Sequence, residues 1–367
     1  MNRSDWSFYL DNAAALREEI DRLGVDVPLA ESRGAMGKPI RLRRCRIPNR
    51  WCAQPISGND ARSDGAPSAL TLRRYTRLAE GGFGLLWVEA ALASRPAQPR
   101  PGRLVLAADT QESFAAFAQA VRSAARRAGR PNPALILQLV AEAGASEPLP
   151  DDDALDRAGA GLEAAAALAA GAGFDGIDLS AASGDLPARL LEAFGRPGRY
   201  GGPLDQRARF LLDAVSRLRS RQPDCLIGVR LNAYAARADP RGFGVSAGDY
   251  RRPDPDEPTR LARMLRDAGA DILNVTANSP NLRAPPDQRA RHPFADADLG
   301  DEHPLTTLSR NLALVRALRE AAGGLAVVAG GWTWLRNYLP AAAAGALEAG
   351  AADFAGVGRP GLAYPDL

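Results

Sequence analysis

The sequence of 367 residues predicts a (β/α)8 TIM barrel, an α/β fold, with an N-terminal helical extension. Three observations point to this fold. From about residue 41, eight short apolar segments alternate with seven segments of helical spacing, the pattern of a parallel α/β protein. Glycine-rich turns end the seventh and eighth repeats, where barrels often bind phosphate. An open sheet would more often show G-x-G-x-x-G after its first strand, so a closed barrel fits better.

The elements follow in order along two predicted units, residues 1–40 and residues 41–367. The first unit is the extension, in which residues 5–24 have helical spacing and Gly24 is a stop signal. The second unit is the barrel, and its strands are expected at 51–54, 84–90, 134–139, 176–179, 226–231, 272–276, 325–329 and 354–357. Helices are expected near 70–80, 111–128, 154–171, 205–221, 257–268, 307–321 and 336–349, and a final helix is expected to be short or missing.

Two long segments rich in Pro, Asp and Arg remain irregular in this interpretation, at residues 235–255 and 278–304. Loops of that length in a compact domain are usually lids or binding loops. The two histidines, His292 and His303, fall in the second segment and are expected to be solvated rather than catalytic.

Composition limits the classes of function. Hydrophobic residues make up 46% of the chain and charged residues 24%, which suits a folded protein with a large core. The net charge of +3 is small, so nucleic acid is not a favoured partner. No apolar run reaches a membrane span and no secretory leader is recognised, so we predict a cytoplasmic protein that acts on a small molecule, with a homo-oligomer left open.

Two residue types exclude further chemistry. Lys38 is the only lysine and precedes the predicted barrel, which excludes Schiff-base catalysis inside it. The three cysteines, Cys45, Cys52 and Cys225, have no paired spacing, so we predict no metal site and no disulfide framework.

The two glycine-rich turns predict a phosphate site. The seventh strand ends in Ala329-Gly330-Gly331, and the eighth is followed by Gly358-Arg359. Glycines allow backbone N–H groups to approach an anion closely, and an arginine binds two phosphate oxygens at once. Taken singly, either turn is also explained as an ordinary tight turn; together, at these positions, they favour phosphate.

The stretch 173–209 decides the chemistry, because its strand ends at the catalytic face of a barrel. It resembles the old yellow enzyme family of flavin-dependent ene-reductases, whose segment runs D-G-(V/I)-x-(I/L)-H-x-x-(H/N)-G-Y-L and later Y-G-G-S-x-x-N-R-x-R-F. The opening at residues 47–58 is also similar to that family's first strand, and the resemblance covers about residues 40–367. The frame positions kept are Asp175, Gly176, Gly184, Leu186, Tyr200, Gly201, Gly202, Arg207, Arg209 and Phe210.

The resemblance implies non-covalent FMN, with NADH or NADPH as reductant. It places Pro55 and Ile56 along the isoalloxazine and Ser57 near its O4/N5 edge. It places Gln138 on the flavin pyrimidine and Arg230 near N1/O2, where a fixed cation stabilises reduced flavin. It places the FMN phosphate at Gly330, Gly331, Gly358 and Arg359. Two of these residues have plainer alternatives. Ser57 could be a helix cap or turn residue, and Gln138 could be a core amide with its hydrogen bonds satisfied.

The chain departs from the family where substrate is activated. Ser180 and Ser183 stand where the family has its His and His/Asn donors, and Asp185 stands where it has a proton-donating Tyr. Serines donate single hydrogen bonds and carry no charge, so ordinary enones are expected to be poor substrates. Burial beside reduced flavin is expected to raise the pKa of Asp185, which makes it a candidate proton shuttle. Alternatively, Asp185 caps the helix that begins near Leu186.

These residues predict an FMN-dependent oxidoreductase acting on a non-standard small molecule, by reduction or desaturation of an activated C=C or C–C bond, as in specialised biosynthesis. The alternatives are a flavin-site barrel without redox turnover, acting as a binding or non-redox protein, and a barrel isomerase or lyase whose phosphate site holds the substrate.

Overall fold

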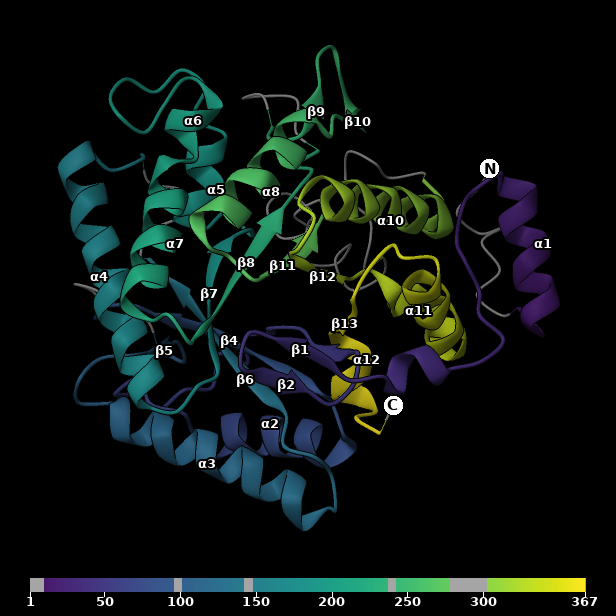
Figure 1. Cartoon of the computed structure of the whole chain (residues 1–367), viewed down its shortest axis with the longest axis horizontal. Helices are drawn as coiled ribbons and strands as arrows, with labels where there is room; N and C mark the ends of the chain where they lie inside the picture. The colour runs from purple at the N-terminus through teal and green to yellow at the C-terminus, as the bar shows by residue number, and fades with distance from the viewer. Residues whose placement is uncertain (1–9, 96–100, 142–147, 237–241, 278–301, 367) are drawn as a thin grey trace.

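The computed structural model describes residues 10–95, 101–141, 148–236, 242–277 and 302–366. At its centre, eight parallel strands close into a barrel in the order β3-β13-β12-β11-β8-β7-β6-β4, with β4 pairing back to β3 (Figure 1). The predicted (β/α)8 barrel is therefore confirmed, and each of the eight expected strands is present. Their bounds are β3 Trp51–Ala53, β4 Leu85–Leu92, β6 Ala134–Val140, β7 Gly176–Ala181, β8 Leu226–Asn232, β11 Ile272–Thr276, β12 Ala326–Ala329 and β13 Phe354–Val357.

Helices form the outer layer (Figure 1) because each has one apolar stripe that packs on the strands. In α8 the buried residues Pro258, Leu261, Ala262 and Leu265 recur at helical spacing, and the opposite face is charged. The long helices are α2 Ala69–Gly81, α3 Gln111–Arg127, α4 Asp152–Gly171, α7 Arg209–Arg221, α8 Asp256–Ala268, α10 Pro304–Ala321 and α11 Leu339–Glu348. Shorter segments are α5 Leu186–Leu191, α6 Leu204–Arg207, the expected short final helix α12 Arg359–Ala363, and the 3-10 segments η2 Gly34–Gly37 and η4 Trp332–Tyr338.

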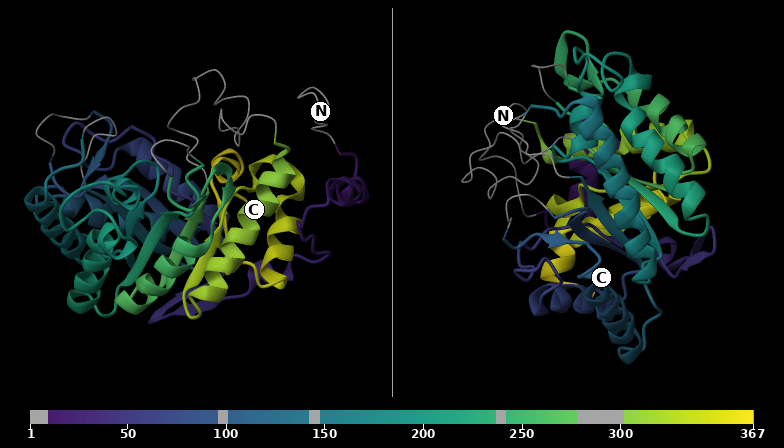
Figure 2. Two further views of the ribbon diagram at one scale, coloured as in Figure 1. Left: turned by 90° about the horizontal axis from the view of Figure 1, so that it is seen from above. Right: turned by 90° about the vertical axis from the view of Figure 1, so that its left-hand side faces the viewer.

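In the described part of the N-terminal extension, the α-helix α1 (Ala13–Leu23) begins later than the spacing predicts. Residues 10–12 precede the helix because the Asn12 side chain accepts the backbone N–H of Ala15 and caps it, while residues 1–9 lie outside the described part. Gly24 ends the helix in the left-handed conformation, as predicted (φ 63°). The extension runs beside α10 and α11 on the outside of the barrel (Figure 2), where Ala30 N–H donates to the Ala341 carbonyl. The domain boundary at residue 40 stays a prediction.

The barrel interior at the N-terminal ends of the strands is apolar. It is covered by a hairpin that the sequence did not reveal. Strands β1 (Ile40–Leu42) and β2 (Cys45–Ile47) pair antiparallel and pack against buried side chains of the barrel such as Trp87 and Phe354. A second antiparallel pair, β9 (Val245–Ser246) and β10 (Asp249–Pro253), occupies part of the segment expected to be irregular at 235–255. Most of the other expected loop, residues 278–301, lies outside the described residues.

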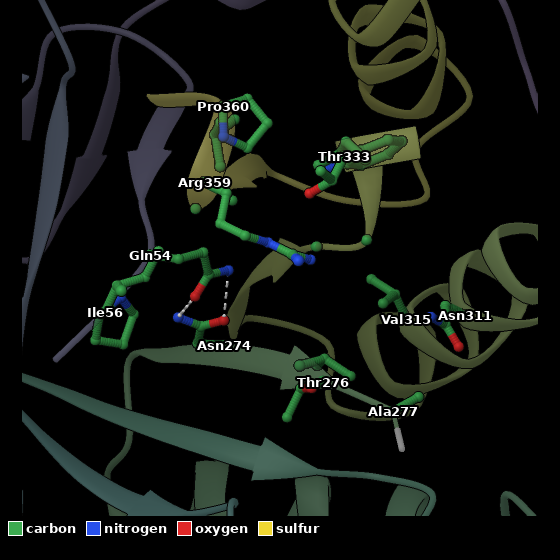
Figure 3. Close-up of a pocket in the computed structure, with 18 of the residues that line it drawn as sticks. Gln54, Ile56, Asn274, Thr276, Ala277, Asn311, Val315, Thr333, Arg359 and Pro360 are labelled. Carbon is green, nitrogen blue, oxygen red and sulfur yellow. Dashed lines mark hydrogen bonds between the residues drawn. The ribbon is translucent and has the colours of Figure 1, made fainter. Parts of the chain in front are cut away.

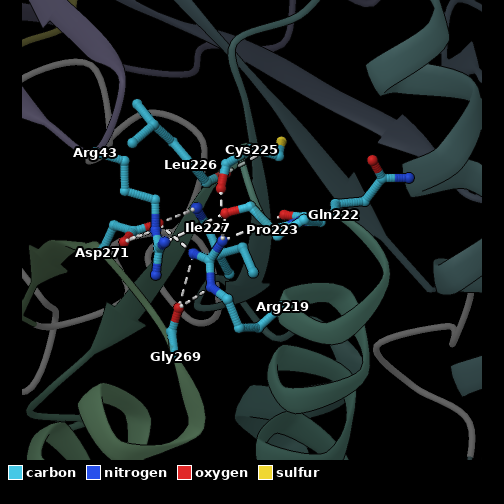
Figure 4. A network of polar contacts seen from close by, with 9 residues as sticks. All are labelled: Arg43, Arg219, Gln222, Pro223, Cys225, Leu226, Ile227, Gly269 and Asp271. Carbon is cyan, nitrogen blue, oxygen red and sulfur yellow. Dashed lines mark hydrogen bonds and ion pairs between the residues drawn. The ribbon is translucent and has the colours of Figure 1, made fainter.

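An aspartate directly before a strand ties the barrel's N-terminal end together. Asp271, ahead of β11, accepts the Ile227 N–H of β8 (2.8 Å) and binds both Arg219 (2.5 Å) and Arg43 (2.6 Å), as Figure 4 shows. The same arrangement recurs before two other strands, where Asp175 and Asp353 accept the N–H groups of Leu135 and Val327 and pair with Arg122 and Arg319. These contacts fix the end of the barrel opposite the glycine-rich turns and leave the other end free for chemistry.

Candidate active site

The barrel interior toward the C-terminal ends of the strands contains polar side chains. Gln54, just after β3, and Asn274, on β11, exchange two amide hydrogen bonds of 2.8 and 2.9 Å (Figure 3). Strands β13 and β12 separate β3 from β11, so this pair crosses the barrel interior. A Cβ on Gly356 would lie 2.0 Å from Gln54 Nε2, so only glycine leaves room for this amide pair.

A second polar group joins the neighbouring strands β6, β7 and β8. Asp178 is fully buried; one carboxylate oxygen accepts from the Gln138 amide (2.6 Å) and the other from the Arg230 backbone N–H (2.7 Å). Burial raises the pKa of Asp178 to about 6, although the Gln138 hydrogen bond and the Arg230 charge act in the opposite direction. The pattern Gln–Asp–Arg is thus one connected unit inside the barrel.

A cavity opens at the C-terminal ends of the strands. Its wall includes seven of the nine residues predicted to bind cofactor: Pro55, Ile56, Arg230, Gly330, Gly331, Gly358 and Arg359. The two glycine-rich turns, after β12 and β13, therefore face the same space. The amide pair Gln54–Asn274 and the side chains of Thr276 and Thr333 also line it (Figure 3).

Two guanidinium groups in this cavity have unused hydrogen-bond donors. Arg359 points into the cavity (Figure 3) and makes no hydrogen bond or ion pair with any described residue; burial lowers its pKa. Arg230 donates one bond to the Pro55 carbonyl (3.3 Å), but its buried Nε has no partner in the described chain. Desolvation lowers the pKa of Arg230, while Asp178 and Asp185 oppose that change. Unpaired cations beside glycine turns favour an anionic ligand.

The remaining two predicted cofactor residues, Ser57 and Gln138, are outside the cavity wall. Gln138 has the satisfied-amide contact described above. Ser57 lies in the loop after β3, and the cap of α2 is Ser68, so the helix-cap alternative for Ser57 is wrong. The loop is fixed beside Ser57, because Gly58 N–H donates to the buried Glu89 carboxylate (2.9 Å).

The three predicted catalytic residues separate into a pair and a single residue. Ser180 is buried at the end of β7, and its hydroxyl lowers the pKa of the Asp185 carboxyl. Burial has the larger effect and raises the pKa of Asp185, opposed first by the Ser180 hydroxyl and then by the charges of Arg103 and Arg230. Asp185 stands at the N-terminal cap position of α5, but its side chain makes no capping bond, so the capping alternative is wrong. Ser183 differs from this pair because it is exposed, and its backbone is in the left-handed conformation (φ 54°).

The described histidine has a structural role rather than a solvated one. His303 is buried, caps α10 by accepting the Leu305 N–H (3.2 Å), and packs edge-on against Trp334. The expectation that it is solvated is therefore wrong, because capping and ring packing both favour burial. His292 lies outside the described residues.

Sequence reasoning missed several cavity residues, chiefly Gln54, Asn274, Thr276, Asn311 and Thr333. A signal existed for Asn274: an amide inside an otherwise apolar strand, ILNVT, is costly to bury without a partner. Its partner on another strand depends on barrel closure. In the described ranges, no cluster of His, Cys, Asp or Glu is arranged to hold a metal ion, and no helix is long and apolar enough to cross a membrane.

Comparison with known proteins identifies the family that the site resembles. Residues 161–243, which include Ser180, Asp185 and Arg230, match the model of the NADH:flavin oxidoreductase / NADH oxidase family. The chain is 30% identical over 199 residues to "Putative 12-oxophytodienoate reductase 12" of Oryza sativa subsp. japonica, covering 53% of this chain and 41% of that protein. It is 27% identical over 261 residues to the NADH oxidase of Thermoanaerobacter brockii, covering 65% and 38%. The chain thus spans about two fifths of the length of these curated relatives.

Solved structures share the fold. The old yellow enzyme homologue from Zymomonas mobilis superposes with a TM-score of 0.66 at 20% identity, covering 90% of each chain. Morphinone reductase in complex with tetrahydroNAD gives 0.65 at 21% identity, covering 91% of this chain and 89% of the other. The resemblance to the old yellow enzyme family is confirmed by the matched segment, and the barrel by these structures.

Proposed function

We propose that this chain, with its confirmed resemblance to the old yellow enzyme family, is an FMN-dependent oxidoreductase that acts on a non-standard small molecule. The observation that carries the proposal is the cavity in which both glycine-rich turns, the unpaired Arg359 and the partly unpaired Arg230 meet. A flavin mononucleotide has a phosphate at one end and a polar, electron-accepting edge at the other, so it would use both cations.

The residues present fit this cofactor. Arg359 and the backbone at Gly330, Gly331 and Gly358 would hold the phosphate, because a free guanidinium and open N–H groups are what that anion requires. Arg230 would face the pyrimidine edge, where its buried, partnerless Nε offers a donor and its charge favours the reduced cofactor. Pro55 and Ile56 add the apolar wall of the same cavity.

When bound, FMN supplies hydride transfer at its N5, with NADH or NADPH as the proposed partner in the redox cycle. The chain's own residues handle orientation and the proton. Asp185, with a pKa raised by burial, is the proposed donor or acceptor of the proton. The Ser180 hydroxyl, which lowers the pKa of this carboxyl, is proposed to orient it. Ser183, exposed on the turn, remains a proposed substrate contact only.

The substrate is proposed to be one that does not depend on imidazole donors. No histidine stands at Ser180 or Ser183, and the described His303 is used as a helix cap. A carboxyl acid–base group without strong oxyanion donors suits either reduction of a strongly activated alkene or desaturation, in which a base removes a proton as hydride leaves. Cytoplasmic location and a homo-oligomeric state stay proposals.

Anaerobic titration tests this proposal. The purified protein is loaded with FMN, mixed with NADH or NADPH under nitrogen, and followed by the visible absorption of the flavin. Bleaching, followed by recovery on adding an oxidant, is expected. FMN binding without bleaching by either nucleotide would favour the flavin-site barrel without redox turnover. Failure to bind FMN at all would favour an isomerase or lyase that uses the phosphate site for its substrate.

A further inference from the structure

The Gln138 amide is held in one orientation by Asp178. Gln138 Nε2 lies 2.6 Å from a carboxylate oxygen of Asp178, which is fully buried. At about pH 7.5, above the Asp178 pKa of about 6, the carboxylate is ionised and only accepts hydrogen bonds. The amide must therefore turn its NH2 group toward Asp178 and its oxygen away. Reversing the amide would set its oxygen against a buried carboxylate oxygen with no hydrogen between them, which is unfavourable.

Asp178 cannot turn aside, because its other oxygen is also bound. That oxygen accepts the backbone N–H of Arg230 over 2.7 Å, and the pairing of β7 with β8 fixes the position of this N–H. Both carboxylate oxygens are thus in use. The amide pair Gln54–Asn274 has no such direction, since both amides can be reversed together and still exchange two hydrogen bonds.

The oxygen of Gln138 is left as an unused acceptor. Among the described residues no donor reaches Gln138 Oε1, and this oxygen is not one of their buried polar atoms that lack a partner, so it borders open space. Gln138 is outside the cavity wall, but only the Asp178 carboxylate separates its amide from the backbone of Arg230, which belongs to that wall and has an unpartnered Nε. An acceptor on β6 and a donor on β8 therefore flank Asp178 on β7.

We propose that Asp178 is a positioning residue that fixes the polarity of the cofactor site: it holds Gln138 as an acceptor, so that the site selects a ligand edge with an N–H group beside a carbonyl. The inference rests on the proposed function for the identity of the ligand. The pyrimidine of FMN has such an edge, where N3–H would meet Gln138 Oε1 and the neighbouring carbonyl O2 would meet Arg230. Without Asp178 the same glutamine could present either end of its amide.

Asp178→Asn is expected to reverse the Gln138 amide. The Arg230 backbone N–H keeps its place, so the single oxygen of the substituted side chain is needed there. The NH2 group of that side chain then faces Gln138, and the glutamine must turn its own oxygen inward to accept from it. The NH2 group of Gln138 takes the place of the acceptor at the cofactor edge, where it opposes the N3–H of FMN.

Solvent exchange of the Gln138 side-chain amide protons tests this orientation without any flavin. Glutamine side chains are labelled with 15N in the full chain, and Gln138→Met identifies the signal by removing it. In the wild type at about pH 7.5 these protons are expected to exchange at least about tenfold more slowly than those of Gln119, an exposed glutamine on α3. In Asp178→Asn they are expected to exchange about tenfold faster than in the wild type, because they face open space.

Binding of two flavins tests the consequence for the cofactor. In 3-methyl-FMN a methyl group replaces the N3 hydrogen and the rest of the molecule is kept. The wild type is expected to bind FMN about tenfold or more tightly than 3-methyl-FMN, whereas Asp178→Asn and Gln138→Met lose the preference. Asp353→Asn is the matched control and keeps it, because Asp353 likewise accepts a strand N–H, that of Val327, but at the opposite end of the barrel.

Unchanged exchange or an unchanged flavin preference in Asp178→Asn would overturn the positioning role. If Asp178→Asn does not fold, the role would be overturned by wild-type Gln138 protons that exchange as fast as those of Gln119, or by an undiminished preference in Gln138→Met. Protein that binds neither flavin but shows faster Gln138 exchange in Asp178→Asn would keep the orientation by Asp178 and reject the flavin function. Protein that binds both flavins equally, with exchange unchanged by Asp178→Asn, would do the reverse.

Discussion

The backbone N–H of Arg230 donates to the Asp178 carboxylate over 2.7 Å and joins β8 to β7 inside the barrel. The other carboxylate oxygen is held by the Gln138 amide, and the side chain is fully buried. Asp178 is thus a counter-charge to Arg230 in the folded protein. Its pKa of about 6 lies above the ordinary value of 3.8 because burial disfavours the ionised form.

This raised pKa predicts a pH-dependent difference in stability between the FMN-free wild type and Asp178→Asn. The folded state binds the proton more tightly than the unfolded chain does. The stabilising contribution is therefore complete below about pH 4 and is lost as pH rises through about 6. The wild type should gain about 2 kcal/mol relative to Asp178→Asn between about pH 7.5 and about pH 4.5. Urea unfolding across that range measures it, and a constant difference would show that Asp178 does not titrate there.

Asp185→Asn separates catalysis from stability. Because the Asp185 side chain makes no capping bond, the substitution should leave the unfolding free energy and FMN content nearly unchanged. Turnover should fall by about 10²–10⁴-fold, the usual contribution of general acid–base catalysis. Steady-state rates on the best substrate found for the wild type measure this. Asp151→Asn, at the true cap of α4, is the matched control. Full turnover in Asp185→Asn would eliminate the proton-shuttle role.

Ordinary ene-reductase substrates should react slowly. Cyclohexenone and maleimide need donors on their carbonyl oxygen, and each missing donor commonly costs about 10²–10³ in rate. Rates of flavin reoxidation by these two compounds, compared with those of the Zymomonas mobilis homologue, measure the loss. Equal rates would mean that Ser180, Ser183 or another group replaces the imidazoles in full.

Replacing Arg230 should shift the flavin reduction potential. Arg230→Gln removes a fixed positive charge from the proposed pyrimidine edge, so the oxidised form should be favoured by about 1–3 kcal/mol, which is roughly 20–65 mV for two electrons. Arg230→Lys should keep most of the potential, since it retains the charge. Equilibration with a reference dye measures all three proteins, and an unchanged potential in Arg230→Gln would place Arg230 away from the flavin.

The barrel could be predicted from the sequence because its strands are mainly apolar runs of the right length, such as residues 325–329, and helical spacing follows most of them. The two glycine-rich turns were equally readable, since Gly330 and Gly358 follow such strands directly. Side-chain contacts between strands could not be predicted from the sequence. Gln54 meets Asn274 across the barrel, and Gln138 meets Asp178 through the β6–β7 register, and both depend on closure.

Side-chain choices between competing partners were also beyond the sequence. Asp185 is at a cap position, where an aspartate usually bonds to helix N–H groups. Here the Asp185 side chain makes no capping bond, and burial raises its pKa. His303 caps α10 although histidine is an uncommon cap, because its ring also packs on Trp334.

The cavity's assignment to FMN is tested most directly by comparing FMN with riboflavin, which lacks only the phosphate, in the wild type and in Arg359→Ala. The account predicts that the wild type binds FMN more tightly than riboflavin. Arg359→Ala should weaken FMN binding by about 2–4 kcal/mol, roughly 30- to 1,000-fold, and leave riboflavin binding unchanged. Arg73→Ala, an exposed arginine on α2, should change neither affinity. Quenching of flavin fluorescence gives the dissociation constants. Full FMN occupancy in Arg359→Ala on dilution, or equal losses for FMN and riboflavin, would contradict the phosphate site.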